Sequence, residues 1–315
     1  MGGRLAKQQP RIAVLLPCYN EEAAIGATVE GFRRALPDAT VYVYDNNSRD
    51  RTKEVAALAG AVVRTEPQQG KGRVVRRMFA DIEADVYIMA DGDLTYDPEA
   101  APEMVRMLLE EQLDMIVGTR KHEAVEAYRG GHVLGNKLFT SLLSGLFGRT
   151  FTDIFSGYRA FSRRFVKSFP ILSSGFEIET EMSVHALELR MPVGEVETRY
   201  GARPEGSESK LSTYGDGWRI LKTIATLYRV ERPVLFFGSI GALLVILALI
   251  LAAPLVLTYL ETGLVPRFPT AILATGLIII AVLCFFAGLI LDTVTRGRRE
   301  IRRLAYLALP APPEG

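Results

Sequence analysis

The stretch "RIAVLLPCYNEEAAIGATVEGFRRAL" (residues 11–36) decides the fold class. It opens with an apolar run that ends at a proline, which is typical of a buried strand. The remainder, "EEAAIGATVEGFRRAL", begins with two acidic residues, which favour the N-terminal end of a helix dipole, and so it predicts a helix. The polar cluster "PCYNEE" (17–22) lies between the two elements.

The same alternation continues along the chain. Further strands are predicted in "ATVYVYDNNS" (39–48), "AVVRTE" (61–66), "DVYIMA" (85–90) and "LDMIVGTR" (113–120). Further helices are predicted in "DRTKEVAALAG" (50–60), "GKGRVVRRMFADIEA" (70–84) and "APEMVRMLLEEQ" (101–112). Alternating strands and helices pair in parallel through crossovers, so the pattern predicts an α/β domain with a mostly parallel sheet.

Polar clusters follow four of these predicted strands, at 17–22, 45–50, 91–93 and 118–121. Each cluster alone fits an ordinary turn. In open α/β sheets, however, ligands bind beyond the carboxyl ends of the strands, and all four clusters fall on that edge. We therefore expect a binding or catalytic site there.

The segment "ADGDLTYDP" (90–98) contains the most specific of these clusters. Asp91 and Asp93 are the expected ligands of a divalent cofactor, Mg²⁺ or Mn²⁺, because these ions favour carboxylate oxygens and Mg²⁺ usually binds together with substrate phosphates. Gly92 is expected to allow a close approach of backbone and ligand. Asp97, which precedes Pro98, is expected to cap a helix.

The motifs "PCYNEE", "DNNSRDRT", "QQGKG" and "DGD", in this order, resemble the nucleotide-sugar half of family 2 glycosyltransferases. That resemblance implies a fold of the GT-A type. The segments "TDIFSGYRAFSRR" (152–164) and "PEGSESKLSTYGDGWRIL" (204–221) resemble the polyprenyl-phosphate branch, which includes dolichyl-phosphate mannose synthases and bacterial polyprenyl-phosphate glucosyltransferases. The resemblance implies inverting transfer of a sugar from a UDP- or GDP-linked donor to undecaprenyl or dolichyl phosphate.

The resemblance also implies roles for individual residues. The nucleotide-sugar contacts would come from Pro17, Tyr19, Glu21, Asp45, Lys71, Asp91 and Glu177. The catalytic residues would be Asp153, Asp93 and Arg120. Many relatives carry an aspartate where this chain has Asn46. A purely structural role for Glu177 also stays open.

The acceptor phosphate needs hydrogen-bond donors, the cationic ones above all, and the expected residues are Arg159, Arg203, Ser209 and Lys210. A phosphate monoester has its second pKa near ~6, so the acceptor oxygen is mostly deprotonated at neutral pH. Whether Asp153 acts as a base or only orients Arg159 or the sugar therefore stays open.

Two long uncharged stretches, 233–260 and 268–291, follow the front domain. A helix of 24 residues reaches ~36 Å, against a hydrocarbon core of ~30 Å, so they predict a membrane hairpin over 233–291; buried core helices are the alternative. Arginines flank the pair, whereas the connector holds only Arg267. The positive-inside rule then predicts a multi-pass protein of the inner (plasma) membrane with a cytoplasmic catalytic domain.

The expected organisation has four parts: a GT-A domain over 1–211, a juxtamembrane amphipathic helix over 212–232, the hairpin over 233–291 and a basic cytoplasmic tail over 292–315. A second interfacial helix is expected at 135–148, with amphipathic packing on the sheet as the alternative.

A net charge of +1 predicts no nucleic-acid partner. No signal peptide is expected, and Cys18 and Cys284 are not expected to pair. The sequence leaves open the sugar, the nucleotide, the length of the polyprenol and the oligomeric state, including a homo-oligomer. Two other functions also stay open: transfer to a glycan hydroxyl, and a non-catalytic membrane scaffold. Against the first, the chain lacks a Gln-x-x-Arg-Trp element, since its one tryptophan, Trp218, lies in "GDGWRIL".

Overall fold

The computed structural model describes residues 9–122, 151–171, 175, 177–204, 226 and 228–313. The chain divides into two compact units. Met1–Gly217 and Arg302–Gly315 together form one unit, which we name the catalytic unit after the site expected in it, and Trp218–Ile301 forms the hairpin unit. The strand-end clusters all belong to the catalytic unit.

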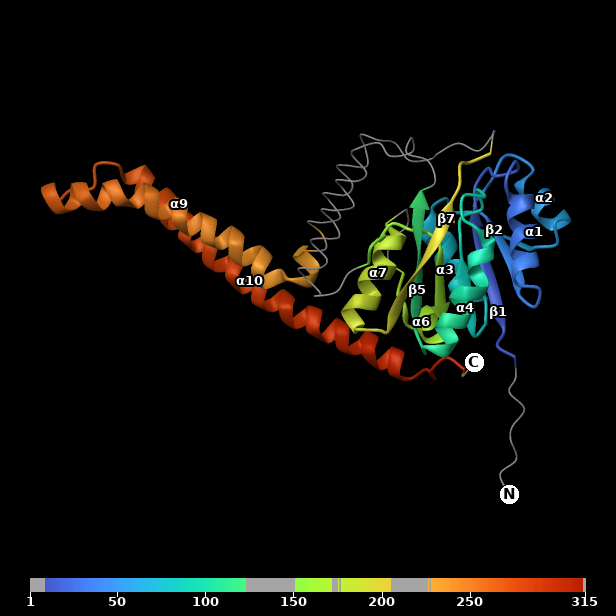
Figure 1. Cartoon of the computed structure of the whole chain (residues 1–315). Helices are drawn as coiled ribbons and strands as arrows, with labels where there is room; N and C mark the ends of the chain where they lie inside the picture. The colour runs from blue at the N-terminus through green and yellow to red at the C-terminus, as the bar shows by residue number, and fades with distance from the viewer. Residues whose placement is uncertain are drawn as a thin grey trace, which may run out of the picture. The chain divides into compact units, whose positions relative to one another are not determined.

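Within the described residues, seven strands form one sheet in the order β3-β2-β1-β4-β6-β5-β7 (Figure 1). Their bounds are β1 Ile12–Cys18, β2 Thr40–Asp45, β3 Val62–Thr65, β4 Val86–Met89, β5 Met115–His122, β6 Arg159–Ser162 and β7 Val193–Tyr200. β6 runs antiparallel to β4 and β5, and the other pairings are parallel. The predicted α/β class with a mostly parallel sheet is confirmed.

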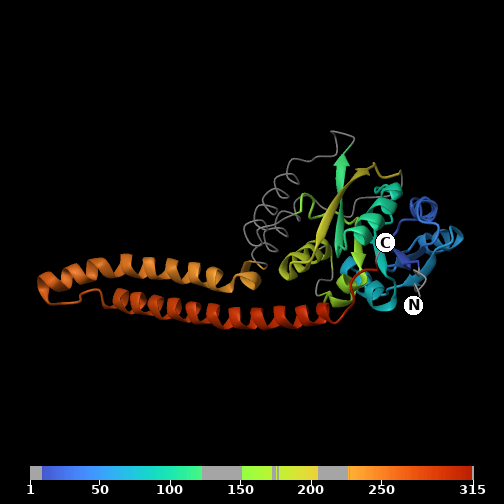
Figure 2. The same cartoon turned by 60° about the horizontal axis from the view of Figure 1, so that its bottom comes forward.

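Helices cover both faces of this sheet (Figures 1 and 2). They are α1 Ile25–Ala35, α2 Thr52–Leu58, α3 Lys71–Asp81, the short 3₁₀ helix η1 Pro98–Ala100, α4 Ala101–Glu110, α6 Arg163–Ser168 and α7 Ile178–Leu189. Alternate side chains of a strand point to opposite faces. Ile88 of β4 accordingly joins a buried cluster with Phe32 of α1 and Met104 of α4, while Tyr87 packs against Phe79 of α3. Asp97 accepts the N–H of Glu99 at 3.0 Å, which confirms the predicted cap.

A buried histidine lies on α7. His185 is 2% exposed, its ring packs against Phe165 and Phe169, and neither ring nitrogen has a hydrogen-bond partner. Burial, with a smaller contribution from the charge of Arg302, lowers the pKa of His185 to about 3. The histidine is therefore neutral in the folded chain at neutral pH.

His185 should make the catalytic unit acid-sensitive. Since its pKa is near ~6.5 in the unfolded chain, unfolding takes up a proton as the pH falls below that value, and the free energy of unfolding drops by about 1.4 kcal/mol at about pH 5.5. His185→Leu should remove most of this dependence. Melting temperatures measured between neutral pH and that point would test the prediction, and equal acid slopes for wild type and variant would contradict it.

The hairpin unit contains α9 Pro233–Thr262 and most of α10 Phe268–Leu307, which lie side by side (Figure 2). Both helices are long and apolar enough to cross a membrane. Small residues bring them close: a Cβ at Gly241 would lie 3.1 Å from the carbonyl oxygen of Ala281, and one at Gly288 would lie 3.2 Å from the Cα of Val234. Such contacts are common between membrane helices.

The segment after the second span differs from the expected basic tail. α10 continues to Leu307, so residues 292–307 are helical. Residues from Arg302 onward belong to the catalytic unit: Arg302 donates to Glu188 at 2.6 Å, and the hydroxyl of Tyr306 donates to Asp114 at 2.7 Å. Of the predicted interfacial helices, 135–148 and most of 212–232 lie outside the described residues.

Candidate active site

The loops after β1 and β2 meet at the carboxyl edge of the sheet. The backbone N–H of Asn20 donates to Ser48 Oγ at 2.9 Å, and the N–H of Arg49 donates to Asn20 Oδ1 at 2.8 Å. The clusters 17–22 and 45–50 therefore lie against each other, as adjacent parallel strands require. The expected nucleoside-pocket residues at the end of β1 and in the loop after it are half-buried or buried: Pro17, Tyr19 and Glu21.

Asp45, expected to contact the base or ribose, is fully buried at the end of β2. Its carboxylate accepts the N–H of Ser48 at 3.2 Å, and Lys53 Nζ lies 3.9 Å away. The carboxylate therefore orders the turn after β2, and the contact with a nucleoside stays a prediction.

Asn46 fixes the loop that leads into α3. Its Nδ2 donates to the carbonyls of Glu66 and Gln68 at 3.0 and 2.8 Å, and its Oδ1 accepts the N–H of Gly70 at 2.7 Å. An aspartate could not donate to those two carbonyls. The amide thus places Lys71, the first residue of α3, relative to the end of β2.

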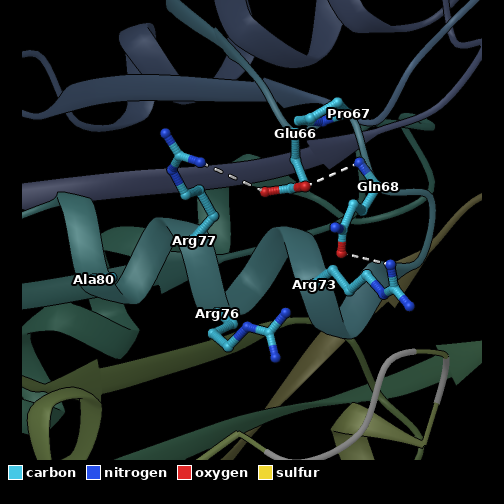
Figure 3. Close-up of a pocket in the computed structure, with 7 residues that line it drawn as sticks. All are labelled: Glu66, Pro67, Gln68, Arg73, Arg76, Arg77 and Ala80. Carbon is cyan, nitrogen blue, oxygen red and sulfur yellow. Dashed lines mark hydrogen bonds and ion pairs between the residues drawn. The ribbon is translucent and has the colours of Figure 1, made fainter.

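A cavity of 390 Å³ opens beside this loop, along α3 (Figure 3). Its lining consists of Glu66, Pro67, Gln68, Arg73, Arg76, Arg77 and Ala80. Arg73 donates to Gln68 Oε1 at 2.6 Å, and Arg77 lies 3.8 Å from Glu66. No residue predicted for the site lines this cavity. The predicted charged residues Lys71, Asp91 and Asp93 lie instead at the carboxyl end of β4.

Lys71 lies between two carboxylates at that end. Its Nζ is 2.5 Å from Asp91 Oδ1 and 2.5 Å from Glu179 Oε1, and its side chain is 10% exposed. Burial alone would lower the pKa of Lys71, but the charges of Asp91 and Glu179 outweigh it and raise that pKa above its ordinary value. Lys71 is therefore a fixed positive charge beside Asp91, whose side chain remains 30% exposed.

Gly157 lies against this ion pair and contacts Tyr96. A Cβ at Gly157 would lie 3.0 Å from Asp91 Oδ2 and 3.3 Å from Lys71 Nζ, so a side chain there would crowd both groups. The N–H of Gly157 donates to the hydroxyl of Tyr96 at 2.9 Å. Burial raises the pKa of Tyr96, which stays protonated at neutral pH.

Asp93 is the more buried of the two aspartates. Its Oδ1 accepts the hydroxyl of Thr95 at 2.6 Å, and its Oδ2 lies 2.8 Å from Arg203 Nη2. Burial, followed by the negative charge of Asp91, raises the pKa of Asp93. The contact brings Arg203, an expected acceptor residue, onto one of the expected metal ligands.

Gly92 separates these aspartates for a packing reason. A Cβ at this position would lie 2.3 Å from Cys18 Sγ and 3.2 Å from Ile25 Cδ1. The close approach expected of Gly92 is therefore made to the thiol of β1.

Gly92→Ala should destabilise the catalytic unit by about 1–3 kcal/mol, because the added methyl group overpacks the site. Adding Cys18→Ala removes the opposing sulfur and should recover most of that loss. Melting temperatures of the two single variants and the double variant test this expectation; if the double variant melts at or below Gly92→Ala, the steric explanation fails.

Arg120, at the end of β5, forms a two-pronged ion pair with Asp153. Its Nε lies 2.7 Å from Asp153 Oδ2 and its Nη2 lies 2.8 Å from Oδ1, while the guanidinium carbon is 5.4 Å from the Tyr200 ring centre. Burial would lower the pKa of Arg120, but the hydrogen bonds to Asp153 and the nearby negative groups raise it. Asp153 therefore orients Arg120, not Arg159.

The expected contact of Arg159 with the acceptor phosphate is wrong for this structure. Arg159 is fully buried at the start of β6, where its guanidinium donates to the carbonyls of Ser156 and Ile154 at 2.9 and 2.6 Å and to Ser183 Oγ at 3.0 Å. Burial lowers the pKa of Arg159 to about 10. The side chain supports the turn before β6 from inside and does not reach the surface.

Two glutamates at the start of α7 lie in different surroundings. α7 begins at Ile178, so Glu177 precedes the helix and its carboxylate lies beside Gly175. Glu179 points to Lys71. A role of Glu177 toward the sugar stays a prediction, and Ser209 and Lys210 lie outside the described residues.

The donor set fits a divalent ion that arrives with further ligands. Among the described residues, no group of three or more His, Cys, Asp or Glu side chains is arranged to hold a metal. Asp91 and Asp93 would supply carboxylate oxygens, and the oxygens of a diphosphate and water would complete the shell, as Mg²⁺ prefers.

Comparison with known proteins identifies the family to which the chain belongs. The sequence pattern of Glycosyl transferase family 2 matches residues 13–169. The glycosyltransferase AglJ of Haloferax volcanii is 34% identical over 232 residues, covering 73% of this chain and 76% of AglJ. The dolichyl-phosphate hexose transferase of the same organism is 28% identical over 221 residues, covering 70% of this chain and 95% of that protein.

Among solved structures, glucosyl-3-phosphoglycerate synthase from Mycobacterium tuberculosis, in complex with Mn²⁺, UDP and glucosyl-3-phosphoglycerate, superposes with a TM-score of 0.57. The match has 24% identity and covers 71% of this chain and 80% of the synthase. This likeness shows the fold, and the expected GT-A architecture is confirmed. With a relative above 30% identity that is covered over three quarters of its length, the chain belongs to glycosyltransferase family 2.

Proposed function

We propose that this chain transfers a hexose from a UDP- or GDP-linked donor to a polyprenyl phosphate at a membrane surface, with inversion at the anomeric carbon. The observation that carries the proposal is the contact between Arg203 and Asp93 at 2.8 Å. It joins Arg203, an expected acceptor residue that precedes the hairpin in sequence, to a carboxylate expected to meet the donor diphosphate. The name of the Haloferax dolichyl-phosphate hexose transferase supports the same acceptor class.

One set of site residues binds the donor and another binds the acceptor. Asp91 and Asp93 hold the donor end, and Lys71 lies close enough to share the charge of a bound diphosphate. A Mg²⁺ or Mn²⁺ ion held by the two aspartates would neutralise charge that develops on the departing diphosphate. Arg203 offers a cation to phosphate oxygens, with Ser209 and Lys210 as further proposed donors.

Asp153 serves as an orienting group in this proposal. Both of its carboxylate oxygens already accept from Arg120, and the acceptor phosphate needs no base at neutral pH. Held in this way, Arg120 presents its remaining donors in a fixed direction, which suits a planar guanidinium better than a lysine ammonium.

The experiment is incubation of the purified full chain with Mn²⁺, a polyprenyl phosphate and a panel of UDP- and GDP-sugars, followed by mass analysis of the lipid. The expected product is a lipid phosphate carrying one hexose, formed together with the nucleoside diphosphate. Sugar found only on a glycan hydroxyl would overturn the choice of acceptor. Failure to release nucleoside diphosphate from any donor would favour a scaffold.

We further propose that the catalytic unit faces the cytoplasm and that the connector between α9 and α10 faces the other side of the inner (plasma) membrane. The arginines that flank the spans support this orientation. Val265→Cys, at an exposed connector position, should react with an impermeant maleimide in intact cells. Leu58→Cys, on exposed α2, is the matched control and should react only after permeabilisation; the reverse pattern would invert the topology.

A further inference from the structure

The two aspartates of the site are each already paired with a cation. Lys71 lies 2.5 Å from Asp91, and Arg203 lies 2.8 Å from Asp93. Lys71 has a second carboxylate, Glu179, also at 2.5 Å. Glu179 is buried in the first turn of α7, far in sequence from both other groups.

From this arrangement we infer that Lys71 and Arg203 keep a bare divalent ion away from the aspartates, and that Glu179 is the positioning residue that holds Lys71 when Asp91 is released. The inference rests on the proposed function only in taking Asp91 and Asp93 as the metal ligands. It assigns Glu179 a role that the sequence motifs do not indicate.

The geometry gives the physical reason. A divalent ion that binds both aspartates must approach two fixed positive charges at close range, which opposes its entry. A diphosphate arriving with the ion carries negative oxygens that offset the charge of Lys71 and, until the acceptor phosphate binds, that of Arg203, so the two ligands favour each other's binding. Glu179 is the second carboxylate at Lys71 Nζ, so it is the described carboxylate on which Lys71 can remain when the diphosphate and the ion bind.

Binding measurements without any acceptor test this coupling. Calorimetry on the full chain would compare Mn²⁺ alone with Mn²⁺ in the presence of UDP and, separately, of GDP. For wild type, one of these nucleotides should tighten Mn²⁺ binding by about tenfold or more, since a coupling of that size corresponds to ordinary linkage energies. Lys71→Met should tighten the binding of Mn²⁺ alone and reduce the effect of the nucleotide.

Glu179→Gln should have the opposite effect on Mn²⁺ alone. It removes the second carboxylate that Lys71 can contact. The ammonium of Lys71 then stays paired with Asp91, and Mn²⁺ binds more weakly than in wild type. If Lys71 and Glu179 merely stabilised the fold, both Lys71→Met and Glu179→Gln would weaken the binding of Mn²⁺ alone. Arg76→Met is the matched control, because it removes one exposed charge from the same helix outside the aspartate pair, and it should leave Mn²⁺ binding unchanged.

Two results would overturn the inference: a Lys71→Met chain that binds Mn²⁺ alone no better than wild type, or equal Mn²⁺ affinity with and without both nucleotides. Should Lys71→Met not fold, Lys71→Gln and Arg203→Met carry the same expectation of tighter Mn²⁺ binding. None of these measurements needs sugar transfer or a lipid. The Mn²⁺ affinities can therefore be interpreted even if the chain does not transfer a hexose to polyprenyl phosphate.

Discussion

Asp93→Asn should lower the kcat/KM of sugar transfer by about 10³-fold while the chain still folds, because the change removes one charged ligand from the site at constant shape. In the wild type the hydroxyl of Thr95 donates to Asp93 Oδ1 at 2.6 Å, and the asparagine oxygen can still accept this hydrogen bond. The ion pair with Arg203, in contrast, is lost. Initial rates over a range of donor and Mn²⁺ concentrations would measure the effect.

Asp97→Asn is the matched control for this change. It makes the same replacement four residues later, at a carboxylate that caps η1. Asparagine caps helices about as well as aspartate does, so the rate should stay close to wild type. Similar losses in both variants would mean that Asp93→Asn acts through the fold of the loop and not through the site.

Arg120→Lys should lower kcat by about 10²-fold, although it preserves the charge, because lysine cannot reproduce a two-pronged contact. In the wild type both oxygens of Asp153 are held by one guanidinium. A lysine would contact one oxygen at a time and leave Asp153 and the cation free to turn. Steady-state kinetics that separate kcat from the KM of each substrate would measure the effect.

Lys121→Arg provides the comparison for Arg120→Lys. Lys121 is the next residue of β5 and pairs with Glu197 at the exposed surface, where ion pairs contribute little. Kinetics close to wild type are expected for it. An Arg120→Lys enzyme as fast as Lys121→Arg would show that the fork between Arg120 and Asp153 has no part in transfer.

The sequence predicts the first half of the fold well because its strands are apolar runs separated by amphipathic helices. β6, Arg159–Ser162, escapes prediction because its sequence, RAFS, begins and ends with a polar or charged residue and so forms no apolar run. Its antiparallel insertion between β4 and β5 depends on pairing across the sheet, which local patterns do not encode. The sequence therefore predicts the strand-end edge but not how the second half of the sheet is completed.

The site shows a similar division. Asp91 and Asp93 are recognisable because the spacing itself has a chemical meaning. Glu179 is not, because the choice among Glu177, Glu179 and Glu181 depends on where α7 begins, and the helix starts one residue after Glu177. Arg159 misleads for another reason: charged side chains usually face solvent, yet backbone carbonyls can satisfy an arginine that is fully buried.

The return of the chain to the catalytic unit after the second apolar helix has a consequence for biosynthesis. Arg302 and Tyr306 reach partners more than 100 residues earlier, on Glu188 and Asp114. A ribosome must therefore deliver both apolar helices before the globular part receives its last segment. Its assembly is finished only after both apolar helices have been synthesised, and a nascent chain that stalls before Arg302 would present an incomplete globular unit to chaperones and proteases.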